Sequence, residues 1–128
     1  MAEVTMDRIM SASFGETASS IRSTFKRTIN IRQYETETLE LSSTLDIGRS
    51  LCGIERMVIS AILQAQLEYE AYIQMSMKGY ITSSEFDMRK KVLTEDVAGL
   101  VAKGEALLGK PLDYLFDLAN TAEVKSEN

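Results

Sequence analysis

Apolar and polar residues alternate along the chain from position 25 to position 46. The apolar members of this segment fall mainly on odd positions, among them Ile29, Ile31, Leu39, Leu41 and Leu45. The even positions are mostly Lys, Thr, Asn, Arg and Glu. A period of two places successive side chains on opposite faces of a strand. Residues 22–46 are therefore predicted to form β-strands with one buried face.

The charge changes sign within this segment. Basic residues come first and acidic residues follow: Arg22, Lys26, Arg27 and Arg32, then Glu35, Glu37 and Glu40. A chain reversal near Tyr34 would place unlike charges opposite each other in an antiparallel hairpin, where each pair contributes about 0.2–1 kcal/mol. No Gly, Pro or Asn-Gly marks a tight turn at that point. A long bent strand that pairs with another subunit is therefore the alternative.

From residue 50 onward the apolar period becomes helical. Apolar residues recur every three or four positions from 51 to 78, which predicts a long helix with a wide apolar face. Asp46 or Ser50 is the expected N-cap of this helix. Gly79 suits the left-handed position just past its end.

A second and a third helix follow. Thr82 and Glu85 have the spacing of a capping box, which predicts a second helix that ends at Gly109. Thr94-Glu95-Asp96 resembles another helix start, so this helix is interrupted near Leu93 in one interpretation. Pro111 suits the first turn of a short last helix that ends at Ala119.

These elements predict one α+β domain over residues 1–128, with antiparallel strands followed by two long helices and a short one. The segments expected around this framework are a flexible arm at 1–21, strands at 22–46, a helical part at 50–119 and a frayed polar tail at 120–128. A chain of 128 residues is long enough to bury roughly two thirds of its unfolded surface.

Composition excludes several classes of function. The net charge of −5 disfavours general affinity for nucleic acid or anionic membrane. The sequence has no His and a single Cys, Cys52, so it can form neither a Ser-His-Asp or Cys-His site nor a thiolate zinc cluster. We expect a non-enzyme without cofactor or metal. The first ten residues lack a secretory pattern, so we expect a cytoplasmic location.

A basic patch on the strands is the first candidate site. Its expected ligand-binding residues are Arg22, Lys26, Arg27, Asn30, Arg32 and Tyr34. Guanidinium groups suit bidentate contact with phosphate, and aromatic rings stack on bases. A phosphorylated nucleotide is the predicted ligand. The alternative is a solvated strand face whose charges discourage edge-to-edge aggregation.

Helix length and aromatic content favour a homo-oligomer. The first helix would span on the order of 40 Å, which is long for so small a domain. Tyr69 and Tyr72 are amphipathic residues of the kind enriched at interfaces. The expected oligomer contacts are therefore Tyr69, Tyr72 and Met75, with core packing as the alternative for Met75.

The segment Lys26-Arg27-Thr28-Ile29-Asn30-Ile31-Arg32-Gln33-Tyr34-Glu35-Thr36 resembles a stretch in small phage-encoded proteins. Among these, the chain is similar to the Thoeris anti-defence nucleotide sponges in its order of strands and then helices. The resemblance implies a phage-encoded oligomer that sequesters a cyclic nucleotide immune signal. Two alternatives remain open: an acidic protein-binding inhibitor of a host defence complex, similar to anti-CRISPR proteins, and an oligonucleotide-binding accessory protein.

Overall fold

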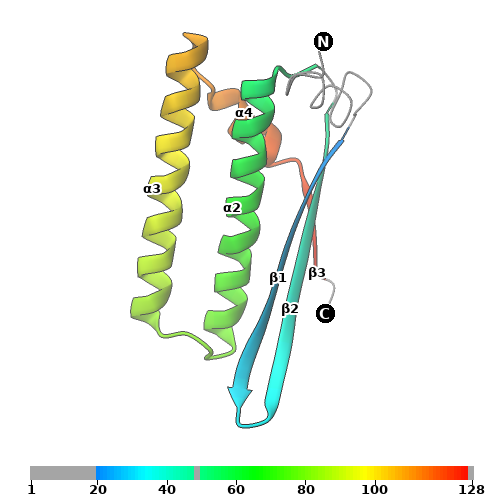
Figure 1. Ribbon diagram of the computed structural model, residues 1–128, viewed down its shortest axis with the longest axis vertical. Helices are drawn as coiled ribbons and strands as arrows, with labels where there is room; N and C mark the ends of the chain where they lie inside the picture. The colour runs from blue at the N-terminus through cyan, green and yellow to red at the C-terminus, as the bar shows by residue number, and fades with distance from the viewer. Residues whose placement is uncertain (1–19, 48–49, 127–128) are drawn as a thin grey trace, which may run out of the picture.

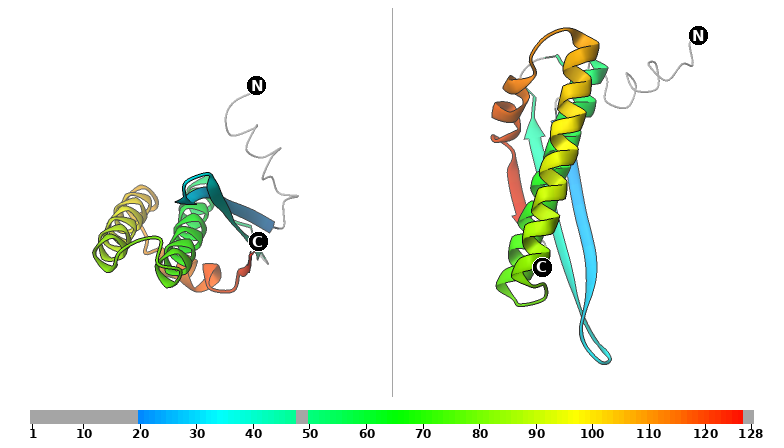
Figure 2. Two further views of the ribbon diagram at one scale, coloured as in Figure 1. Left: turned by 90° about the horizontal axis from the view of Figure 1, so that it is seen from below. Right: turned by 90° about the vertical axis from the view of Figure 1, so that its left-hand side faces the viewer.

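A computed structural model describes residues 20–47 and 50–126. Helix α2 lies between a long β-hairpin on one side and helix α3 on the other, as the view along the helices makes clear (Figures 1 and 2). The short helix α4 packs beside α2 and leads into a third strand. The predicted α+β fold is confirmed. The arm expected at 1–21 lies outside the described residues, except that Ser20 and Ile21 begin the first strand.

The strand segment is a hairpin of β1 (Ser20–Arg32) and β2 (Glu35–Asp46). The two strands are antiparallel, with Phe25 opposite Leu41 on the inner face and Lys26 opposite Glu40 on the outer face. Odd-numbered side chains of β2 face α2, and Leu39, Leu41 and Leu45 are buried there. The alternation in the sequence therefore predicted the buried face correctly. Of the two topologies considered, the hairpin forms rather than the long bent strand.

The C-terminal residues differ from the expectation of a frayed tail. Strand β3 (Glu123–Ser126) pairs antiparallel with β2 and completes a sheet in the order β1-β2-β3. All four of its residues are exposed, so no alternation of burial marks the segment. Its stability in this position comes from backbone hydrogen bonds to β2, which a pattern of side chains does not reveal.

Helix α2 (Gly53–Met77) begins later than the sequence suggested. Cys52, rather than Asp46 or Ser50, occupies the N-cap position, since Asp46 is the last residue of β2. The Glu55 side chain reaches back to accept the Cys52 backbone N–H at 2.9 Å, which satisfies one of the free donors of the first turn. Gly79, with φ of +76°, follows the helix end as predicted.

Helix α3 (Ser83–Leu108) runs without interruption past Leu93, so the proposed break is absent. Thr82 is its N-cap, and the Glu85 backbone N–H donates to Thr82 Oγ1 at 3.1 Å. Gly109, with φ of +68°, ends the helix in the left-handed conformation. Helix α4 (Asp113–Ala119) then forms the short last helix, two residues later than Pro111.

The core has two parts along α2. The upper part joins the hairpin base, α2, α3 and α4 around buried residues such as Ile59, Leu63 and Leu115. The lower part joins the middle of the hairpin to the C-terminal half of α2; its buried members are Leu39, Leu41, Leu67, Ala71, Tyr72 and Met75. Helix α3 has buried residues only on the side toward α2, namely Val101 and Gly104.

Gly104 sets the distance between α3 and α2. A Cβ at this position would lie 2.9 Å from Val58 Cγ2 and 3.0 Å from Leu112 Cδ1, and both of these side chains are fully buried. We expect Gly104→Ala to destabilise the protein by about 1–3 kcal/mol through overpacking. Gly99 on the same helix has open space, so Gly99→Ala should stabilise by up to about 1 kcal/mol. Urea denaturation measures the free energy of unfolding of both variants. An equal rise in stability in Gly104→Ala and Gly99→Ala would contradict the close approach of α2 and α3 at Gly104.

Candidate functional site

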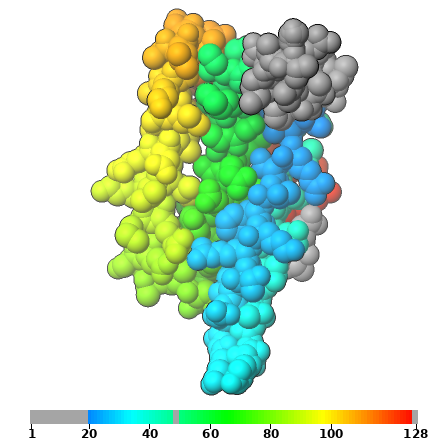
Figure 3. All heavy atoms as spheres, in the orientation of Figure 1, coloured from blue at the N-terminus to red at the C-terminus, as the bar shows by residue number. Residues whose placement is uncertain are grey.

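The end of the β1–β2 hairpin projects past the helices. In Figures 1 and 3 it extends beyond the turn that joins α2 to α3, so no other element covers it. We call residues 30–36 the hairpin end. All of them are exposed. The strands approach each other at the pair Arg32 and Glu35, after a register shift between Asn30 and Arg32 that makes a local bulge.

Tyr34 sits at the tip in an unfavourable backbone conformation. Its φ is +64°, and it is the one non-glycine residue with positive φ in the part of the chain that the structure describes. The left-handed conformation costs roughly 1–2 kcal/mol for a residue with a Cβ. Its side chain is 96% exposed, so no packing contact offsets that energy. A large aromatic ring is therefore held in water at a strained position.

The predicted basic patch is spread along the hairpin. Arg22, Lys26 and Asn30 lie on the outer face of β1, whereas Arg27 lies on the inner face, opposite Leu39, and is exposed. Arg22 and Arg32 are ten residues apart in the strand, a span of about 33 Å. Within one protomer the structure does not bring these residues together around a single ligand.

Carboxylates accompany the cations of the hairpin. Lys26 faces Glu40 across the ladder, and Arg32 Nε forms an ion pair with Glu35 Oε1 at 2.7 Å. Exposed pairs of this kind contribute about 0–1 kcal/mol to stability. Their larger effect is to offset the positive charge that a phosphate would meet. The hairpin end is consequently mixed in charge.

A polar cluster fixes the lower half of the hairpin to the helices. The Glu37 carboxylate on β2 accepts hydrogen bonds from Lys78 Nζ and from Tyr80 Oη, both in the turn between α2 and α3. The hydrogen bond from Lys78, followed by that from Tyr80, lowers the pKa of Glu37. The same bonds raise the pKa of Lys78 and the pKa of Tyr80. These contacts hold the part of the hairpin next to the hairpin end in place against the helices.

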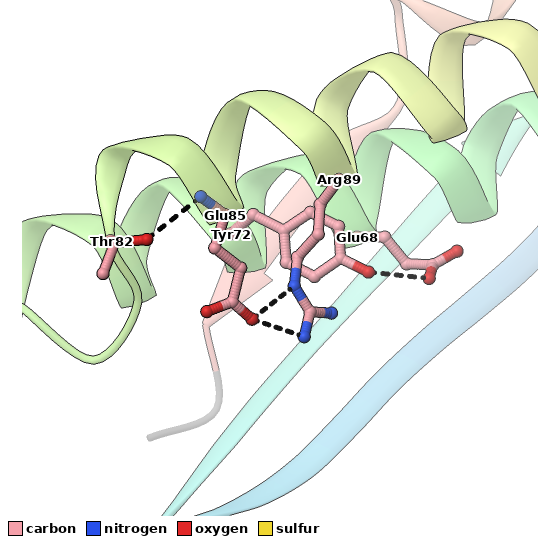
Figure 4. Close-up of polar contacts among 5 residues, drawn as sticks. All are labelled: Glu68, Tyr72, Thr82, Glu85 and Arg89. Carbon is pink, nitrogen blue, oxygen red and sulfur yellow. Dashed lines mark hydrogen bonds and ion pairs between the residues drawn. The ribbon is translucent and has the colours of Figure 1, made fainter.

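The three residues expected at an oligomer interface occupy different environments. Tyr72 and Met75 are buried in the lower core, at 8% and 2% exposure, and Tyr69 is 36% exposed. Tyr72 donates to Glu68 Oε1 at 3.4 Å, and Arg89 lies over its ring while forming an ion pair with Glu85 (Figure 4). Tyr72 therefore joins α2 to α3 within one chain. The oligomeric contact stays a prediction, and Tyr69 is the accessible member.

Sequence reasoning included Tyr34 for stacking on a base but missed the strain at this residue. The available signal was the position of an aromatic residue at the change of charge sign, with no Gly or Asn among residues 33–36 to take a left-handed turn conformation. Cys52 lies at the N-cap of α2 and is exposed. Among residues 20–47 and 50–126, no group of three or more Cys, Asp or Glu side chains is arranged to hold a metal ion.

No helix in the described part of the chain is both long enough and apolar enough to cross a membrane. Comparison of the chain with protein-family models, with curated proteins and with solved structures finds no significant match. The projecting hairpin end, with Tyr34 at its tip, is the most distinctive exposed feature of the described residues.

Proposed function

We propose that this protein acts by binding another protein and that the hairpin end is its contact surface. The observation that carries the proposal is Tyr34, which is fully exposed and strained. The two-residue turn between Arg32 and Glu35 places Tyr34 in the left-handed conformation, which Gly or Asn usually adopts in such turns. A strained residue of another type at such a position is a pointer to function. Tyrosine is also among the residues that contribute most to protein–protein binding energy.

The surroundings of Tyr34 suit a protein partner. Ile31, three residues before Tyr34, is 37% exposed and adds apolar area to the hairpin end. Arg32 and Glu35 supply one charge of each sign. An apolar centre with a polar rim is the usual composition of a protein interface. The anchor formed by Glu37, Lys78 and Tyr80 limits the ordering entropy that binding would require.

The test compares the effect of one substitution on binding and on stability. Tyr34→Gly relieves the left-handed strain, so the free energy of unfolding should rise by about 1 kcal/mol. Loss of the ring should weaken binding to the partner by at least about tenfold. If Tyr34 had a purely structural role, its substitution would not raise the stability of the protein while weakening binding to the partner.

The partner is first captured by a photo-crosslinking amino acid at position 34 in living cells, with the same label at position 107 as control. Leu107 is 65% exposed in the last turn of α3, and Figure 1 shows the C-terminal end of α3 at the opposite end of the molecule from the hairpin end. The captured protein is then purified and titrated by calorimetry against the unmodified chain, Tyr34→Gly and Leu107→Ala. Identical crosslinks at the two positions, or unchanged affinity of Tyr34→Gly, would contradict the proposal.

Sequestration of a phosphorylated nucleotide by an oligomer is the second candidate. It is favoured by the position of β1 at the edge of the sheet, where pairing with a second copy would bring cations of two chains together. Native mass spectrometry of the purified protein would report subunit number and any bound nucleotide. If Arg27→Glu and Arg32→Glu leave cyclic nucleotide binding unchanged in calorimetry, this candidate is excluded.

Either activity fits the resemblance to phage-encoded anti-defence proteins that the strand segment suggests. In that setting the protein would work in the cytoplasm of the host cell, and its partner would belong to a host defence complex. The crosslinking experiment addresses this point as well, because it identifies the captured protein.

A further inference from the structure

Helices α2, α3 and α4 border an open groove with a volume of about 400 Å³. Helix α2 contributes Ile62 and Ala65, α3 contributes Leu93 and Val97, and α4 contributes Phe116. No hairpin residue in the described part of the chain lines the groove, and Phe116 places it on the side of α2 where α4 packs; Figure 2 shows α4 beside α2. Its volume falls within the roughly 300–1,000 Å³ that small-ligand sites occupy, and its mostly apolar lining is typical of them.

The groove has a charged end and an apolar end. Lys90 is the one charged residue among the described residues that line it, and its Nζ lies 5.8 Å from the centre of the Tyr69 ring. Because α2 and α3 are antiparallel, Ile62 and Val97 lie at the other end. Val97 lies seven positions after Lys90, which is about 10 Å along the helix.

Lys90 differs from the other lysines that lie over tyrosine rings. Lys78 is paired with Glu37, and Lys110 is 3.8 Å from Glu55. For Lys90, no carboxylate lies within ion-pairing distance among residues 20–47 and 50–126. A single ammonium group at the mouth of an apolar groove complements one negative charge on an otherwise apolar molecule.

We propose that this groove binds a small amphipathic carboxylate, with its alkyl chain along Ala65, Leu93 and Val97 and its carboxylate at Lys90. A fatty acid of medium chain length matches the span of the groove. A monoanionic carboxylate fits better than a doubly charged phosphate ester, because the lining supplies one cation. The site is independent of the hairpin end and of the function proposed for it.

The test uses decanoate as the probe and decanol as the uncharged counterpart, both titrated by calorimetry below their aggregation concentrations. The full chain should bind decanoate. Lys90→Gln should weaken decanoate binding by about fivefold and leave decanol binding unchanged. Lys91→Gln is the matched control, because Lys91 is exposed on the same helix and does not line the groove.

A second pair of variants tests the alkyl position. Ala65→Leu fills the groove and should abolish binding of both probes, while circular dichroism and the melting temperature report that the fold is kept. Ala102→Leu adds the same side chain on the exposed side of α3 and should leave binding unchanged.

Three results would overturn the inference. The first is absence of decanoate binding by the full chain at millimolar concentration. The second is equal decanoate affinity in Lys90→Gln and the unmodified chain. The third is a dimer that Ala65→Leu dissociates, since a second copy would then occupy the groove. Tyr34→Gly should bind decanoate normally, so failure of this site and failure of the hairpin contact are distinguishable.

Discussion

Leu67→Ala is expected to lower the free energy of unfolding by about 2–5 kcal/mol, because it removes a fully buried side chain and leaves a cavity. Leu67 lies on α2 at the centre of the lower core, where Leu39 and Leu41 of the hairpin meet the helix. These contacts cannot close around the gap without moving the hairpin relative to α2. The expected loss is a large part of the stability of a small domain.

Urea denaturation followed by circular dichroism measures this loss, and Leu107→Ala is the matched control. Leu107 is 65% exposed, so its truncation should change stability by no more than about 0.5 kcal/mol. Hydrogen exchange adds a local readout, because the amides of β1 and β2 should lose protection before those of the upper core. If Leu67→Ala lowered the free energy of unfolding by less than Leu107→Ala does, the lower core would not be what holds the hairpin against α2.

Glu55→Gln is expected to have the second largest effect on stability. Glu55 is 6% exposed. Its carboxylate accepts hydrogen bonds from the Cys52 backbone N–H and from Tyr114 Oη and lies 3.8 Å from Lys110 Nζ. It therefore joins the start of α2 to α4 and the connection before it. Hydrogen bonds to a charged group contribute about 1.5–3 kcal/mol, and the neutral amide should lose most of one such bond at pH 7.

The effect of Glu55 should depend on pH. Burial raises the pKa of the Glu55 carboxyl, but the hydrogen bonds from Tyr114 and Cys52 outweigh burial, and the net direction is downward. A carboxyl with a lowered folded-state pKa stabilises the protein above its unfolded-state pKa of about 4.3 and loses that contribution as the pH falls through the folded-state value. The stability difference between the unmodified chain and Glu55→Gln should therefore be constant from about pH 6 to about pH 8 and shrink in acid.

Glu95→Gln is the control for this measurement, since Glu95 is exposed on α3. Its stability should stay within about 0.5 kcal/mol of the unmodified chain at every pH. Tyr114→Phe removes one donor to Glu55 and should reproduce part of the loss without changing a charge. If the stability difference of Glu55→Gln grew as the pH fell, the lowered pKa of Glu55 would be wrong.

Local patterns in the sequence predicted much of the fold. Alternation of apolar residues in the strand segment identified the buried face with Leu39, Leu41 and Leu45. Helical periodicity, the Thr82 cap and the two terminal glycines located α2 and α3, with errors at the start of α2 and at Leu93. These features could be predicted because each depends on residues that are close together in the chain.

Contacts between distant segments could not be predicted from local patterns. Strand β3 forms on backbone hydrogen bonds to β2. Glu55 is buried where Tyr114 of α4 and Lys110 of the connection before α4 approach it. For the candidate site as well, the sequence indicated the residue types but not their arrangement in space. The basic and aromatic residues of the hairpin were identified by type, but their dispersal along β1 follows from strand geometry.

By itself, the sequence determined the α+β class, the buried face of the hairpin and the three helices, because short-range periodicity and capping encode them. Only the tertiary structure decided that the hairpin end projects into solvent, that Tyr72 and Met75 are internal, and that Lys90 lines an apolar groove. The reason is physical: exposure and the shape of a surface depend on which segments pack together, and that packing joins residues far apart in the chain.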